Sequence, residues 1–222
     1  MVVIENYINR LINELKKKFG YRLLYVGLQG SYLREEADER SDIDVMVLLD
    51  KLTTDDLELY KTIIAENENS EKSCGFICGK SELNNWNPSE MCQLINTTKD
   101  YYGKLSEYIP AYTTEDNRNF IKLSLNNLYH EICHRYIHAS KEKNKEKLPV
   151  SYKSVFFILQ NIHYQETGNF LQTQKELLLQ LSEDDKKVLS MALNIRNKNT
   201  DDFDESFQML FDWCKNTIIK GT

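Results

Sequence analysis

The feature that most constrains the fold is a pair of apolar runs joined by a polar segment. The first run, YRLLYVGL, ends just before Gly30 and Ser31, and the second, IDVMVLL, begins at Ile43 between Asp42 and Asp44. Apolar runs of this length, bounded by turn residues, predict two buried strands. The sequence therefore predicts a sheet in which two carboxylates stand where a buried strand begins.

The two carboxylates and the Gly-Ser turn predict neighbouring sites for a cation and an anion. Residues two apart in a strand point to the same side, so Asp42 and Asp44 face one point. Two such charges repel each other unless a cation lies between them, and Mg²⁺ prefers a couple of carboxylates plus substrate phosphates. Gly30 and Ser31, at the start of a helix, offer backbone N–H groups and a hydroxyl to a phosphate. This arrangement is typical of phosphoryl or nucleotidyl transfer.

A third carboxylate on a nearby strand usually completes such a site. The segment SEMCQLINTT, residues 89–98, alternates enough to predict a strand that pairs with CGFICG, residues 74–79. Glu90, at the start of this strand, is therefore the first choice for the third acid. Glu82 and Asp100 are poorer candidates because we expect them in a turn and after a strand.

The stretch GSYLREEADERSDIDVMV, residues 30–47, resembles the signature of the DNA polymerase β-type nucleotidyltransferases. The resemblance rests on the order of strand, Gly-Ser, spacer, SDID and strand. It implies a mixed sheet with helices on one face. It also implies transfer of a nucleoside monophosphate from ATP or another nucleoside triphosphate, with two Mg²⁺ ions. By match, the nucleotide-binding residues are Gly30, Ser31, Arg34 and Ser41, and the catalytic metal ligands are Asp42, Asp44 and Glu90.

The composition fits an ordinary soluble protein, with 41% hydrophobic and 28% charged residues among 222. The net charge of −6 argues against a nucleic-acid partner, which needs a basic face, and suits a cationic or neutral one. The five cysteines contain no CxxC pair, which favours reduced thiols. The sequence has no signal-peptide pattern and no run of about 20 apolar residues. We therefore expect a cytoplasmic protein without a membrane partner, and the sequence assigns no oligomeric state.

The pattern changes near residues 109–114, where Pro110 interrupts it. Strands and helices alternate before this point, and only helices are predicted after it, with KEKNKEKLP, residues 141–149, as a polar connection. The predicted fold class is α+β: a nucleotidyltransferase domain over 1–110, with a mixed sheet and helices, followed by a C-terminal all-α helical bundle over 111–222. Helical spacing predicts helices over 3–18, 52–68, 116–141, 151–168, 173–181, 182–197 and 203–220.

The back half resembles the helical domain of aminoglycoside adenylyltransferases of the streptomycin and spectinomycin kind. In that family an apolar helix leads to a Thr-Gly turn and then to a helix start that contains Ser/Thr-Lys. Thr167-Gly168 and Thr173-Gln174-Lys175 stand in those places here, although Gln174 interrupts the Thr-Lys pair. The resemblance implies that Lys153 or Lys175 reaches the triphosphate as a point charge.

The same resemblance implies an acceptor, a small hydroxylated molecule for which a cationic aminoglycoside-like antibiotic is the model. Two other functions remain open at this stage: a protein-adenylylating, antitoxin-like transferase and an inactive nucleotide-binding sensor. The attached helical half argues against the antitoxin type, and the presence of all three acids argues against the sensor. The carboxylates that could bind a cationic sugar are Glu131, Glu166, Asp184 and Asp185.

The segment HEICH, His130 to His134, matches the HExxH pattern of zinc proteases, and His138 extends the same helix face. A protease would also need a third ligand, for which His163 is the candidate, and a strand edge to bind substrate. Because the pattern lies in a predicted bundle after a transferase motif, we expect packing or capping histidines instead.

Overall fold

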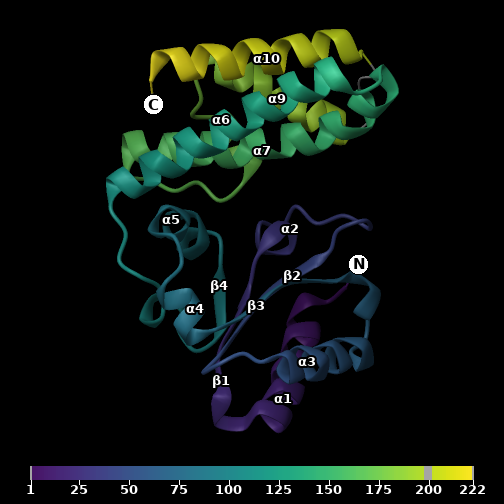
Figure 1. Cartoon of the computed structure of the whole chain (residues 1–222). Helices are drawn as coiled ribbons and strands as arrows, with labels where there is room; N and C mark the ends of the chain where they lie inside the picture. Colours follow the sequence, from purple (N-terminus) through teal and green to yellow (C-terminus); the bar gives the residue numbers. More distant parts are fainter. Residues whose placement is uncertain (1, 198–201, 222) are drawn as a thin grey trace. The chain divides into compact units, whose positions relative to one another are not determined.

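The structure is a computed structural model that describes residues 2–197 and 202–221 (Figure 1). Its internal contacts divide the chain into two compact units, Met1–Tyr112 and Thr113–Thr222. The first unit contains every strand among the described residues, and the second is helical, so the α+β class is confirmed.

The first unit is built on a four-stranded mixed sheet in the order β3-β2-β1-β4. β1 pairs antiparallel with both β2 and β4, whereas β3 pairs parallel with β2. Both strands that flank the Gly-Ser segment are where the apolar runs predict them, and β4 is an additional strand that the pattern did not predict. The strands are β1 (Leu23–Leu28), β2 (Ile43–Leu49), β3 (Ser73–Gly79) and β4 (Lys99–Tyr102).

Helices cover both faces of this sheet, which corrects the expectation of helices on one face. Along β2, Val45 and Val47 point into a core shared with α1 and α3, whereas Met46 and Leu48 point into a second core shared with α4 and α5. Asp44 has the same strand parity as Met46 and therefore belongs to the second face. The helices are α1 (Ile4–Phe19), α2 (Gly30–Leu33), α3 (Thr54–Glu66), α4 (Lys80–Asn84) and α5 (Pro88–Asn96).

The predicted strand over residues 89–98 is wrong, because this segment forms helix α5. The side chain of Asn87 caps the helix by accepting from the Ser89 backbone N–H, and Pro88 occupies the first turn, where proline fits well. Met91 and Cys92 are fully buried. Their apolar neighbours at helical spacing pack into the same side, so burial selects a helix over an alternating strand.

The second unit contains five helices among its described residues, packed around one apolar core. The all-helical prediction is confirmed for this part of the chain, and Gly168 ends α7 in the left-handed conformation with φ 71°. The helices are α6 (Thr114–His138), α7 (Lys141–Thr167), α8 (Gln174–Leu178), α9 (Glu183–Arg196) and α10 (Phe203–Lys220).

The predicted polar connection over residues 141–149 is also wrong, because α7 begins at Lys141 and continues through Pro149. The side chain of Ser140 caps this start by accepting from the Lys143 N–H. Asn144 is buried and donates to the Arg135 carbonyl oxygen of α6 at 3.0 Å. Tertiary packing therefore holds a helix where the charged sequence and the proline predict a break.

None of the helices in the described part of the chain is both long and apolar enough to cross a membrane.

Candidate functional site

The two aspartates lie at the start of β2, at the end of the sheet where β1 leads into α2. Asp42 is exposed and Asp44 is half-buried. The Gln29 backbone N–H donates to the Asp44 carbonyl oxygen at 2.8 Å, which ties the end of β1 to the start of β2. The turn that follows β1 is thereby held next to the carboxylates.

Gly30 lies directly against the Asp44 carboxylate. Its φ is 72°, a left-handed conformation that favours glycine. A Cβ atom added at Gly30 would come to 1.9 Å from Asp44 Oδ2. The structure therefore brings together Gly30 of the Gly-Ser turn and Asp44, which lies fourteen positions later in the sequence.

The loop between α2 and β2 is organised by its own polar contacts. Arg34 Nε donates to Glu36 Oε2 at 3.0 Å, and only 9% of the Arg34 side chain is exposed. Ser41 Oγ accepts from the Asp38 backbone N–H at 2.8 Å. Arg34 and Ser41, predicted to bind nucleotide, thus shape the loop that precedes Asp42, and their contact with a nucleotide stays a prediction.

Cys74 stands beside Asp44 on the neighbouring strand. It is the register partner of Asp44 in the parallel β2–β3 pair, its thiol hydrogen-bonds the Asp44 carboxylate, and it is exposed to solvent. The pKa of the Cys74 thiol is raised, first by desolvation and next by the negative charge of Asp44. The strand next to β2 therefore presents a thiol, and not a carboxylate, beside Asp44.

Glu90, predicted as the third acid, does not lie on a strand. It is exposed in the first turn of α5, and its Oε2 accepts from Trp86 Nε1 at 2.8 Å. Nowhere in residues 2–197 and 202–221 do three His, Cys, Asp or Glu side chains lie close enough together to hold one metal ion. The structure thus does not assemble Glu90 with Asp42 and Asp44. The pair Asn87-Pro88, an N-cap followed by proline, was the sequence signal for the helix.

The alternative third acids are also accounted for. Glu82 lies in α4, as the predicted helical turn implies. Asp100 lies within β4 rather than after a strand, and its Oδ1 accepts from the Leu105 backbone N–H at 3.3 Å. Because β4 pairs with β1, on the side away from β2, Asp100 is separated from Asp44 by a whole strand.

The two aspartates fit a hard divalent cation such as Mg²⁺. They offer only oxygen donors, and neither forms an ion pair with any residue for which the structure gives a position. Mg²⁺ is commonly bound by one or two carboxylates together with substrate phosphates and water. Asp42 and Asp44 would hold the ion, and the Gly30 turn would leave room for phosphate oxygens.

The predicted binding residues of the second unit are on its surface. Lys153 in α7 and Lys175 in α8 are both exposed, and their contact with a triphosphate stays a prediction. Of the carboxylates considered for a cationic sugar, Asp185 already accepts from Trp213 Nε1 at 2.8 Å. Glu131 is paired with Arg135.

The structure gives the surroundings of the HEICH segment in α6. Its Glu131 is held by Arg135, and the described part of the second unit contains no strand that could bind a peptide. His130, His134 and His138 are all exposed, so they are not buried packing residues, and a capping role stays a prediction.

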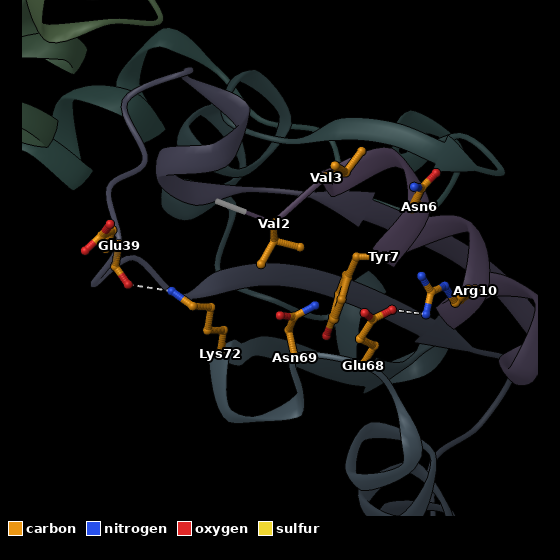
Figure 2. Close-up of a pocket in the computed structure, with 9 residues that line it drawn as sticks. All are labelled: Val2, Val3, Asn6, Tyr7, Arg10, Glu39, Glu68, Asn69 and Lys72. Carbon is orange, nitrogen blue, oxygen red and sulfur yellow. Dashed lines mark hydrogen bonds and ion pairs between the residues drawn. The ribbon is translucent and has the colours of Figure 1, made fainter.

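A cavity of about 500 Å³, which no sequence pattern indicated, lies on the α1 side of the first unit (Figure 2). Lys72, just before β3, donates from its Nζ to the Glu39 carbonyl oxygen in the loop that leads to Asp42. Arg10 and Glu68 form an ion pair at the opposite wall. Lys72 therefore links β3 to the loop that precedes the carboxylates. The lining residues are Val2, Val3, Asn6, Tyr7, Arg10, Glu39, Glu68, Asn69 and Lys72.

Residues 8–83 match the model of the nucleotidyltransferase domain family. This stretch runs from α1 to α4 and contains both the Gly-Ser turn and the two aspartates. The first unit therefore contains a nucleotidyltransferase domain, which confirms the resemblance and the enzyme class that the sequence motif predicted.

The fold extends this likeness to the second unit. The crystal structure of spectinomycin adenyltransferase AAD(9) from Enterococcus faecialis with ATP and spectinomycin superposes with a TM-score of 0.59 at 16% identity. The match covers 96% of this chain and 98% of that one, so the two proteins share a fold over both units.

Two toxin–antitoxin structures match a smaller part of the chain. One is a complex with AMP-PNP, and the other is a mutant of MntA-HpeT. Their TM-scores are 0.33 and 0.32 at 20% and 18% identity, and each match covers 58% of this chain and 92% of the other. No curated protein sequence matches the chain.

Proposed function

We propose that this nucleotidyltransferase transfers AMP from ATP to a hydroxyl of a small acceptor and requires Mg²⁺. The observation that carries the proposal is the contact between Gly30 and the Asp44 carboxylate, within the part of the chain that matches the family. The contact places two features next to each other: a backbone turn suited to phosphate and a pair of carboxylates suited to a cation.

In the proposed reaction, an acceptor hydroxyl attacks the α-phosphorus of ATP, and the bond to the β-phosphate bridging oxygen breaks, which releases pyrophosphate. Asp42 and Asp44 would hold the cations, which would neutralise the charge that develops on the phosphate. Backbone N–H groups at Gly30 and the Ser31 hydroxyl orient the phosphates. The proton of the acceptor hydroxyl leaves to solvent. Orientation and charge stabilisation supply the rate enhancement.

A small cationic acceptor is supported by two observations. The net charge of −6 favours cationic ligands. AAD(9), which has a similar fold, was crystallised with ATP and spectinomycin. A panel of nucleoside triphosphates and hydroxylated acceptors with Mg²⁺, assayed for pyrophosphate, tests the proposal. If pyrophosphate appears only when a protein is the acceptor, the proposal of a small acceptor is wrong. If nucleotide binds but no pyrophosphate is released under any condition, the proposal of a transfer reaction is wrong.

Ser31→Ala is expected to weaken ATP binding by about tenfold to a hundredfold, because a hydrogen bond to a charged phosphate contributes roughly 1.5–3 kcal/mol. Calorimetric titration of ATP with Mg²⁺ measures the change. Ser81→Ala is the matched control, since Ser81 is also the second residue of a short helix, α4. Equal affinities in Ser31→Ala and wild type would mean that the hydroxyl does not contact nucleotide.

Alkylation of Cys74 with iodoacetamide is expected to reduce transfer to less than about a tenth, because the added group lies beside Asp44. Only the thiolate reacts, so the raised pKa makes the reaction slow at neutral pH and faster as pH rises. Burial raises the pKa of Cys92 to about 11 and those of Cys78 and Cys214 to about 12, which leaves the exposed Cys74 and the half-buried Cys133 as the thiols open to the reagent.

Residual activity after treatment measures the effect, and Cys74→Ser is the control that should resist the reagent. ATP with Mg²⁺ is expected to protect the wild-type protein. If mass spectrometry shows that Cys74 is alkylated and the protein is still fully active, this thiol is not part of the site.

A further inference from the structure

Three exposed histidines form a stripe along α6 that the proposed transfer reaction does not use. His130, His134 and His138 are spaced four residues apart, so they lie on one face of the helix over successive turns. The ring centres of His130 and His134 are 5.9 Å apart, and those of His134 and His138 are 4.6 Å apart. His134 is therefore the shared member of two close imidazole pairs.

These spacings suit chelation of one metal ion by two imidazoles. With a zinc–nitrogen bond of about 2.0–2.1 Å, each ring centre lies roughly 3.2 Å from the ion, and two rings at a tetrahedral angle have centres about 5 Å apart. The His134–His138 separation of 4.6 Å lies close to this value, and the His130–His134 separation is longer. The backbone already brings the His134 and His138 rings to chelating distance.

The surroundings of the stripe favour a cation. His138 is the last residue of α6, where the partial negative charge of the helix terminus attracts positive charge. The one basic side chain within this segment, Arg135, is turned away, because its Nη2 donates to Ser151 Oγ of α7 at 2.6 Å and its Nη1 pairs with Glu131. Neither Arg135 nor Glu131 therefore competes for the imidazole nitrogens.

We propose that His134 and His138 form a surface site for a late first-row divalent ion, Cu²⁺, Ni²⁺ or Zn²⁺. Imidazole nitrogen suits these ions, whereas Mg²⁺ prefers oxygen. The ion has two protein ligands and completes its coordination with water, since no third His, Cys, Asp or Glu of the described chain joins the pair. The site is expected to bind Cu²⁺ more tightly than either Ni²⁺ or Zn²⁺. Because both rings are exposed, the ion exchanges freely with solvent and is removed by chelators.

The site differs from that of a zinc protease in what it can do. It has no third protein ligand and no strand for substrate among the described residues, so it binds an ion without activating a peptide. Its consequence is a crosslink across the last turns of α6, and an ion that binds only the folded helix stabilises it by mass action.

Isothermal titration of the chelator-treated protein with Cu²⁺, Ni²⁺ and Zn²⁺ tests the proposal, with thermal unfolding as a second readout. One equivalent of Cu²⁺ is expected to bind and to raise the unfolding temperature. His134→Gln and His138→Gln remove one of two tethered ligands and are expected to weaken binding by at least about tenfold. His163→Gln is the matched control, because His163 lies on α7 outside the stripe.

The double variant Asp42→Asn, Asp44→Asn separates this site from the carboxylates of the first unit. Unchanged Cu²⁺ binding in that variant, together with loss in His134→Gln, supports the proposal. Unchanged binding in both His134→Gln and His138→Gln, or loss of binding only in the aspartate variant, would overturn it. Since the stripe takes no part in nucleotidyl transfer, His134→Gln is expected to keep wild-type pyrophosphate release with Mg²⁺, which also reports that the variant is folded.

Discussion

Replacing Asp44 by asparagine is expected to reduce nucleotidyl transfer by about a thousandfold or more, because stabilisation of the reacting phosphate by a bound metal is worth several kcal/mol. Asparagine keeps the shape of the side chain and removes the charge that fixes the cation. Asp42→Asn is expected to have an effect of the same order. Pyrophosphate release with ATP, acceptor and Mg²⁺ measures both changes.

Asp50→Asn is the matched control for these variants. Asp50 follows the last residue of β2, at the end of the strand opposite to Asp42, and its carboxylate accepts from Arg22 Nε at 3.1 Å. Its loss should affect stability slightly and leave transfer intact. If the turnover of Asp44→Asn at saturating Mg²⁺ is within tenfold of the wild-type value, this carboxylate does not hold the metal.

Gly30→Ala is expected to reduce transfer by about a hundredfold, the cost that a displacement of about 1 Å can have at a reacting centre. The new methyl group would lie 1.9 Å from Asp44 Oδ2, so the carboxylate or the turn must move. The substitution also strains a backbone with φ 72°. Pyrophosphate release per folded molecule, with the folded fraction taken from circular dichroism, measures the effect.

The variant Gly168→Ala distinguishes displacement of the carboxylate from backbone strain. Gly168 has nearly the same φ, 71°, but a Cβ there meets nothing within 4 Å. It should therefore show the same backbone strain, about 1–2 kcal/mol, with wild-type turnover. If the two variants lose stability equally and both retain transfer, the contact between Gly30 and Asp44 has no role in the reaction.

The sequence was sufficient to predict the parts of the fold that local patterns encode. The apolar runs predicted β1 and β2, and Thr53 begins α3 through a local capping box with Asp56. The spacing of Gly30-Ser31 and Asp42–Asp44 predicted the family because those residues belong to one strand–turn–strand segment.

The predictions from the sequence failed where packing between distant segments determines the local structure. Residues 89–98 can read as a strand or as a helix, and burial of Met91 and Cys92 selects the helix. In α7, contacts with α6 outweigh the helix-breaking preference of Pro149. The place of Cys74 beside Asp44 depends on the register of a parallel strand pair joined through α3, which no local pattern specifies.

The position of β2 within the sheet has a consequence for how the site moves. β2 is hydrogen-bonded to a neighbour on each side, and its Val45, Met46 and Val47 are almost fully buried. Amides of such a strand exchange with solvent only when the whole unit opens, whereas the loop before Asp42 is held mainly by short-range polar contacts and opens locally. We therefore expect slow amide exchange along β2 and faster exchange in the loop before Asp42, with the two aspartates between these two segments. In the proposed reaction, the carboxylates would keep their positions while the adjoining loop adjusts to admit nucleotide and release pyrophosphate.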